Sequence, residues 1–155
     1  MEPQAPLPAR RLFAIRQLSS LGVPVSAMLA PVISAINDHE VEHILEKVTE
    51  AGVMDTSYVL FRLPYEVAPL FRNWLLHEYP SCYRQVMSLL CSMHDGKNYD
   101  TKWRTRIRGS GLFAEMIAQR FRLACKRLGL RSRKVRLSAC DFRPPSRNDD
   151  QLSLF

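Results

Sequence analysis

The chain lacks the features that would place it in a membrane, a secretory pathway or a cysteine-rich metal class. No apolar run approaches the roughly 20 residues that a membrane-spanning helix needs. The N-terminal segment MEPQAPLPARR has no apolar stretch typical of a secretion signal. The four cysteines are widely spaced and form no CxxC pair. We therefore expect reduced thiols, a cytoplasmic location, no membrane contact and no metal site.

Acidic side chains are almost absent from the C-terminal third. Residues 102–147 carry 14 basic and 2 acidic side chains, a net charge of +12, whereas residues 1–101 carry 8 basic and 11 acidic, a net charge of −3. The whole chain has a formal net charge of +7. This asymmetry favours a polyanionic partner, DNA above all, contacted by the C-terminal third.

Two apolar runs predict parallel strands. Val23–Ala30 is almost unbroken and contains β-branched residues, a pattern typical of a strand covered on both faces. Thr56–Leu63 predicts a second strand, which Pro64 ends. The order helix, strand, helix, strand, helix then predicts an α/β fold with right-handed crossovers.

Helical spacing of apolar residues predicts the remaining elements. Asn37 and Glu40 resemble a capping pair at the start of the helix between the strands. His94–Lys102 is predicted to be a polar loop. The five helices are expected over residues 8–21, 37–51, 67–75, 80–93 and 113–128.

Several collinear segments resemble one family. GVPVSAMLAPVISAINDHE, AGVMDTSYVLFRLPYEV, TRIRGSG and AEMIAQRFRLACKRLGL together resemble the DNA-repair-photolyase-like branch of the radical SAM superfamily, which is related to spore photoproduct lyase. The resemblance covers the C-terminal half of a typical member. It implies a partial TIM-like barrel with two parallel strands, flanking helices and a helical C-terminal extension, and it implies a [4Fe–4S] cluster and S-adenosylmethionine as cofactors.

The chain departs from the family in three places. The CxxxCxxC motif that binds the cluster in the N-terminal half of family members is absent, so this chain alone does not provide the three thiolates. Ser34 and Ala35 stand where the family usually has Pro-Gly, and Ser110 replaces a common acid. We therefore expect a C-terminal fragment, from a split gene, a truncation or an internal start, that is inactive alone. Because its strand edge is open, it is expected either to be marginally stable or to pair with another chain that carries the N-terminal half.

This resemblance divides the chain into three parts. Residues 1–78 are expected to be the C-terminal part of the barrel, residues 79–130 the helical extension, and residues 131–155 a basic flexible tail. No internal repeat is visible.

The carboxyl ends of the strands are the first candidate site, because ligands of parallel α/β folds bind there. The resemblance implies that Val32, Ile33, Arg62 and Leu63 line the adenosine part of the cofactor site. Packing within the core is the alternative for the apolar residues. Arg62 is placed for a carboxylate or phosphate, or for an ion pair with Glu66.

Basic side chains form the second candidate site. The segment KWRTRIRGSG contains Trp103, which could stack on a base, and Arg104, Arg106 and Arg108, which could contact phosphates. A solvated turn whose arginines cap the next helix is the alternative. The last helix carries further cations, Arg120, Arg122, Lys126 and Arg127. They predict salt-dependent binding of DNA or RNA, and a solvated charged surface is the alternative.

The last five residues, QLSLF, resemble the pentapeptide with which bacterial proteins bind the replication sliding clamp. Leu154 and Phe155 would enter an apolar pocket, Leu152 would fill a second depression, and Gln151 would form a hydrogen bond at the rim. An arbitrary apolar tail, or one folded onto its own domain, is the alternative.

His39 and His43 are four residues apart, a spacing that can bind zinc. No third ligand is positioned nearby, so solvated helix residues are the favoured interpretation.

Two functions therefore follow from the sequence. The first is the C-terminal part of a radical SAM, DNA-repair-photolyase-like lyase that acts on or near DNA. The second is a non-enzymatic module that binds nucleic acid and the sliding clamp.

Overall fold

The computed structural model describes residues 5–94, 96, 107–130, 140 and 142–143. Within these residues the fold is mixed α/β, with five α-helices and two parallel strands in an open sheet. In chain order the elements are α1 (Pro8–Ser20), β1 (Ser26–Val32), the short 3₁₀ turn η1 (Asp38–Glu40), α2 (Val41–Glu50), β2 (Asp55–Leu60), α3 (Ala68–Glu78), α4 (Tyr83–Ser92) and α5 (Gly111–Arg127).

The predicted parallel pair is confirmed. Residues 26–29 of β1 pair in register with residues 55–58 of β2, and after an irregularity Val32 pairs with Leu60. Helix α2 makes the crossover between the strands. β1 ends at Val32 rather than at Ala30, and β2 covers Asp55–Leu60, so it ends before Leu63 and Pro64. β1 begins later than predicted because the Val23 N–H completes the end of α1 by donating to the Leu18 carbonyl at 3.1 Å. Pro24, which follows, has no N–H to offer, so the strand begins at Ser26.

The expectation that β1 is covered on both faces is wrong for the described residues. Leu29 is buried, whereas Ser26, Met28 and Ala30, which alternate with it, are exposed, and Met28 is 67% exposed. No described element lies over this second face. A continuous apolar run does not reveal this, because Ala and Met are apolar whether or not anything covers them.

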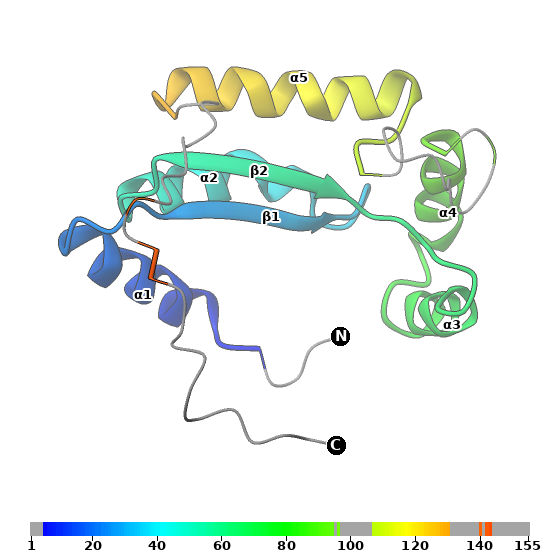
Figure 1. Ribbon diagram of the computed structural model, residues 1–155. Helices are drawn as coiled ribbons and strands as arrows, with labels where there is room; N and C mark the ends of the chain where they lie inside the picture. The colour runs from blue at the N-terminus through cyan, green and yellow to red at the C-terminus, as the bar shows by residue number, and fades with distance from the viewer. Residues whose placement is uncertain (1–4, 95, 97–106, 131–139, 141, 144–155) are drawn as a thin grey trace.

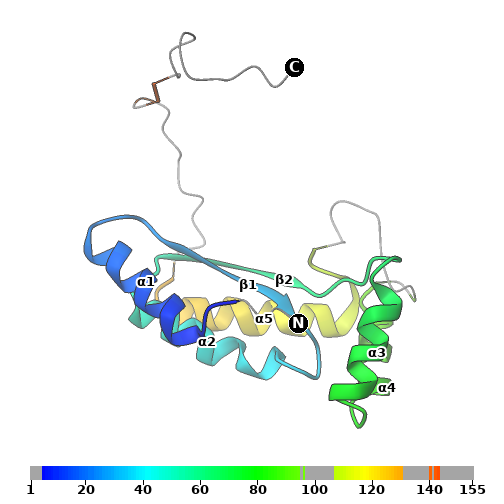
Figure 2. The same ribbon diagram turned by 90° about the horizontal axis from the view of Figure 1, so that it is seen from below.

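The covered face of the sheet carries the larger core. Leu29 of β1, Leu45 of α2 and Ile117 and Phe121 of α5 belong to one buried cluster, and the Tyr58 ring of β2 lies 4.7 Å from the Phe121 ring. Figure 2 shows α1 and α2 on the same side of the two strands. The helices around the sheet therefore all cover one face.

A second, smaller core lies beyond the carboxyl ends of the strands. There α3 and α4 pack against each other and against the segments that leave the sheet (Figure 1). Its fully buried side chains include Leu63 and Leu75, each 0% exposed. Its members are Ile33, Leu63, Ala68, Phe71, Leu75, Val86 and Leu90.

All five predicted helices are present, with shifted ends. Helix α4 begins at Tyr83 rather than at Pro80. The predicted capping pair is wrong, because the Asn37 side chain does not cap the helix. Its Oδ1 instead accepts a hydrogen bond from the Ile33 N–H at 2.7 Å, which closes the loop after β1. No helix of the described residues is long and apolar enough to cross a membrane.

A bidentate ion pair between Glu42 and Arg120 joins helices α2 and α5. Arg120 Nε and Nη2 donate to Glu42 Oε1 and Oε2 at 2.8 and 2.7 Å, and Nη2 also donates to the Asp38 carbonyl at 3.0 Å. Nearby, Arg127 donates to Glu46 at 2.6 Å. Two of the four α5 cations predicted to face a polyanion are therefore paired with carboxylates of α2. The hydrogen bond from Arg120 holds the pKa of Glu42 below its usual value of 4.5.

Arg120→Ala is expected to lower the free energy of unfolding by about 1 kcal/mol, since hydrogen bonds to charged groups contribute about 1.5–3 kcal/mol and this pair is partly solvated. Because the folded pKa of Glu42 is lowered, the contribution is present above pH 4.5 and is lost as the pH falls through the folded pKa. Urea unfolding at neutral and acidic pH measures it.

Arg120→Lys keeps the charge but loses the forked geometry, so it should recover only part of the loss. Lys126→Ala, which removes an exposed cation from the same helix, is the control and should change the unfolding free energy little. A loss from Arg120→Ala that is equal at neutral and strongly acidic pH would contradict the role assigned to Glu42.

Candidate functional site

Four segments that are distant in sequence meet at the carboxyl ends of β1 and β2. The Phe61 N–H donates to the Val32 carbonyl at 2.8 Å and the Leu60 N–H donates to the Ile107 carbonyl at 3.0 Å. The Ser110 N–H donates to the Met93 carbonyl at 2.8 Å. We call the four segments the strand-end cluster: residues 31–38 after β1, residues 61–63 after β2, residues 93–94 after α4 and residues 107–111 before α5.

The loop after β1 is held by its own side chains. In addition to the Asn37–Ile33 bond, Asp38 Oδ1 accepts from the Ala35 N–H at 2.7 Å and Asn37 Nδ2 donates to the Pro31 carbonyl at 3.1 Å. Ala35 has a φ of 63°, in the left-handed region that glycine adopts more easily. This is the position at which the resembled family usually has glycine.

The RGSG turn approaches its own chain closely. Gly109 has a φ of 67°, and a Cβ atom there would lie 3.2 Å from both Leu60 Cδ1 and the Met93 carbonyl oxygen. Glycine at this position thus allows the turn to pack on the end of β2. Arg108, next to it, is exposed. Trp103, Arg104 and Arg106 lie outside the described residues.

Three of the four predicted cofactor residues are core residues in this structure. Val32 belongs to the larger cluster at 4% exposure, and Ile33 and Leu63 belong to the smaller one at 5% and 0%. Packing within the core therefore accounts for all three. Arg62 follows β2 and is partly buried.

A small apolar pocket lies between the two loops and α4. It is lined by Ile33, Ser34, Phe61, Val86, Leu90 and Met93, and its cavity volume is about 10 Å³, room for about one water molecule. Ligand pockets usually measure about 300–1,000 Å³. The pocket is therefore too small for a nucleoside, and its lining residues mainly contact one another.

His94 is a buried residue that the sequence analysis misplaced in a polar loop. It is 1% exposed, and its Nε2 lies 3.3 Å from the Phe61 carbonyl oxygen. A carbonyl only accepts hydrogen bonds, so Nε2 carries a proton, and Nδ1 is buried with no hydrogen-bond partner among the residues that the structure describes. The only sequence signal for this burial is its place directly after the apolar stripe of α4.

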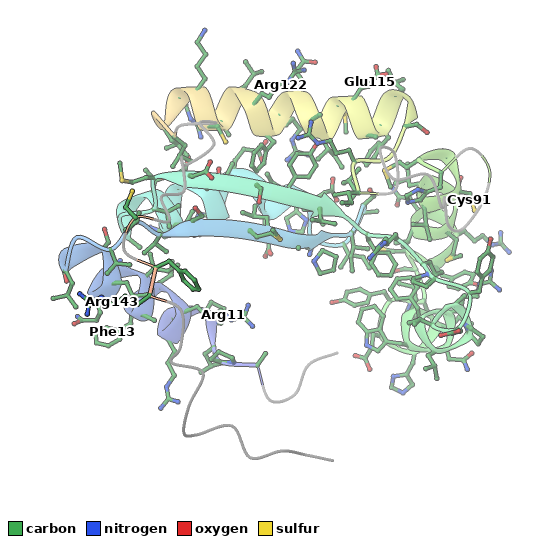
Figure 3. All side chains as sticks on the ribbon, in the orientation of Figure 1. Arg11, Phe13, Cys91, Glu115, Arg122 and Arg143 are labelled. Atoms are coloured by element: carbon green, nitrogen blue, oxygen red, sulfur yellow. The ribbon has the colours of Figure 1, made fainter. Side chains whose placement is uncertain are left out.

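The side chains that could hold a metal do not converge. Cys82 and Cys91 lie at and within α4, Cys125 lies in α5, and Cys140 is exposed in a turn near the C-terminus; Figure 3 labels Cys91. Within the described part of the chain no three His, Cys, Asp or Glu residues gather. His39 and His43 are both exposed, in line with the favoured interpretation of solvated residues. The described residues therefore offer no ligand set for an iron–sulfur cluster.

Arg108 and Arg122 are both exposed, and both act electrostatically on Tyr58 of β2. Burial raises the pKa of the Tyr58 phenol, and the fields of Arg108 and Arg122 act in the opposite direction. Both arginines are therefore close enough to influence one tyrosine, although one precedes α5 and the other lies in it.

The predicted clamp-binding residues Gln151, Leu152, Leu154 and Phe155 lie outside the described residues. In comparisons with known proteins, no protein family, no curated protein and no solved structure matches the chain.

Ala35→Gly is expected to stabilise the chain by about 0.5–1 kcal/mol. Glycine removes the strain of the left-handed backbone at φ 63°, but part of this gain is lost because glycine also raises the conformational entropy of the unfolded chain. Thermal or urea unfolding measures the change. Ala118→Gly, within α5, is the matched control and should destabilise by about 1 kcal/mol. Equal effects of the two substitutions would show that residue 35 is not strained.

Proposed function

We propose that this chain is the C-terminal part of a radical SAM, DNA-repair-photolyase-like enzyme and needs a second polypeptide for catalysis. The observation that carries the proposal is the open sheet of two parallel strands, whose helices all cover one face. The segment resemblance supplies the family, and the geometry supports it in three ways.

The first support is the placement of the helices. In a doubly wound fold helices cover both faces of a parallel sheet, whereas in a barrel they stay outside and the other face lines the interior. The uncovered face of β1, with Met28 and Ala30, corresponds to the interior face of such a barrel. Further strands at the borders of the sheet would complete the barrel and cover this face.

The second support is the loop after β1. Ala35 has the backbone conformation of a glycine, at the position where the family usually has Pro-Gly. The sharp loop is retained without its usual residues, because Asn37 and Asp38 hold it through their side chains.

The third support is the convergence of the resembling segments. The loop after β1, the end of β2 and the RGSG turn come from three separate segments, and backbone hydrogen bonds tie them together directly or through Met93. In parallel α/β folds this end of the sheet is where ligands bind.

In this proposal the chain forms part of the wall of the cofactor pocket and does not itself hold the iron–sulfur cluster. The cluster would be held by a partner polypeptide that carries CxxxCxxC. S-adenosylmethionine, bound at that cluster, would supply the radical chemistry of the family. Arg62, which follows β2, would contact an anionic group of the substrate or cofactor.

The second candidate function is a non-enzymatic module that binds nucleic acid and the sliding clamp. It is favoured by the net charge of +12 over residues 102–147 and by the terminal QLSLF. Arg108 and Arg122 are exposed beside β2 and available to phosphates. The two candidates are compatible, because a clamp peptide can also tether an enzyme to DNA.

Met28→Arg tests the enzyme proposal. Met28 is 67% exposed, so the substitution should change the stability of the chain alone by no more than about 0.5 kcal/mol. It should nevertheless prevent assembly, because an arginine would be buried inside the completed barrel. The tagged chain is co-expressed with the CxxxCxxC half of a longer family member, and iron content and 5′-deoxyadenosine release after reduction are measured.

Leu70→Arg, at a residue of α3 that is 70% exposed, is the matched control and should assemble as the unmodified chain does. The enzyme proposal fails if the unmodified chain neither retains the iron-bearing half nor yields 5′-deoxyadenosine. Equal assembly of the Met28→Arg and Leu70→Arg variants would remove the barrel-interior assignment.

Fluorescence anisotropy with a DNA duplex and surface binding to a bacterial sliding clamp test the second function. The logarithm of the DNA-binding constant should fall linearly with the logarithm of the salt concentration, with a slope of about −0.9 for each phosphate contact. Arg108→Ala should reduce that slope by about 1, whereas Arg84→Ala on α4 should not. Removal of residues 151–155 should abolish clamp binding and spare DNA binding. A salt-independent affinity, or clamp binding without the pentapeptide, would exclude these assignments.

A further inference from the structure

Helix α5 has two apolar faces. Its buried face consists of Ala114, Ile117, Phe121 and Ala124. On the opposite side Leu112, Met116 and Leu123 are exposed by 86%, 40% and 59%. A helix that needed only one partner layer would carry polar residues at these positions.

The exposed apolar residues follow a heptad-like spacing. Leu112, Met116, Gln119 and Leu123 are separated by four, three and four residues, so they form one stripe along the helix. With 17 residues α5 is about 25 Å long. This stripe, which we call the outer stripe, is suited to a second helix lying alongside.

Charges flank the outer stripe asymmetrically. Glu115 lies in the N-terminal half of α5, and Arg122 lies seven residues later, on the same flank of the stripe. Figure 3 labels both residues on α5, and both are exposed. Neither forms an ion pair among the described residues.

We propose that the outer stripe binds the same stripe of a second copy of this chain, with the two α5 helices antiparallel. In this alignment Leu112 lies opposite Leu123 of the other copy, and Met116 lies opposite Gln119. Glu115 then faces Arg122 of the other copy, and the two-fold axis repeats the pair. The inference does not depend on the proposed function, since this face lies away from the sheet.

The charges select this occupant over others. In a parallel pair of α5 helices Arg122 would face the opposite flank of the other copy, where Arg127 lies, so that contact would be repulsive. A uniformly acidic partner helix would meet Glu115, and a uniformly basic one would meet Arg122. The antiparallel copy satisfies both residues with the charges that α5 itself carries.

Charge reversal tests the proposal on the full chain by sedimentation and light scattering over a range of concentrations. Glu115→Arg and Arg122→Glu should each weaken dimerisation at least tenfold, because each places like charges opposite one another twice. The double variant, Glu115→Arg with Arg122→Glu, should restore it. An equimolar mixture of the two single variants should form a heterodimer, since both cross pairs are then of opposite sign.

Arg84→Glu, at an exposed residue of α4, makes the same charge change as Arg122→Glu and should leave dimerisation unchanged. Leu123→Gln, which removes an exposed apolar side chain, should produce a monomer with unaltered unfolding. A chain that is monomeric at all concentrations overturns the proposal. So does a dimer that survives both charge reversals, which would place the contact elsewhere, for example at the open sheet.

Discussion

The hydrogen-bonded pairing of β1 with β2 is the constraint on which the rest of the structure depends. Parallel strands are less self-sufficient than antiparallel ones, and a sheet of two strands is rarely stable without packing against helices. Here α2 and α5 provide that packing on one face, through Leu45, Ile117 and Phe121. The pairing in turn sets the ends of both strands side by side, so that the segments leaving them form the strand-end cluster.

The elements that sequence patterns predict well are those whose residues decide their own structure. Pro8 starts α1, and Gly22 follows its end with a φ of 77°. The parallel order of the strands follows from the helix between them. These features depend on backbone geometry and local spacing, which are visible in a single sequence.

The features that the sequence analysis missed depend on what lies opposite a residue. Met28 and Leu29 are equally apolar, yet only Leu29 has a helix facing it. His94 reads as a loop residue, but the end of β2 buries it under Phe61. Arg120 and Arg122 look alike as cations of one helix, and only the fold shows that Arg120 reaches the carboxylate of Glu42. Val32, Ile33 and Leu63 are buried, as the core-packing alternative for these residues expects, and their part in a cofactor site stays a prediction.

Asp38 takes part in two contacts that were described separately. Its carboxylate accepts from the Ala35 N–H through Oδ1 and lies 3.6 Å from Arg120 Nη1 through Oδ2, while its carbonyl accepts from Arg120 Nη2. One short side chain therefore links the long basic helix to the bend that follows the first strand. A change at Asp38 would therefore disturb the contact between α2 and α5 and the shape of the loop after β1 at the same time.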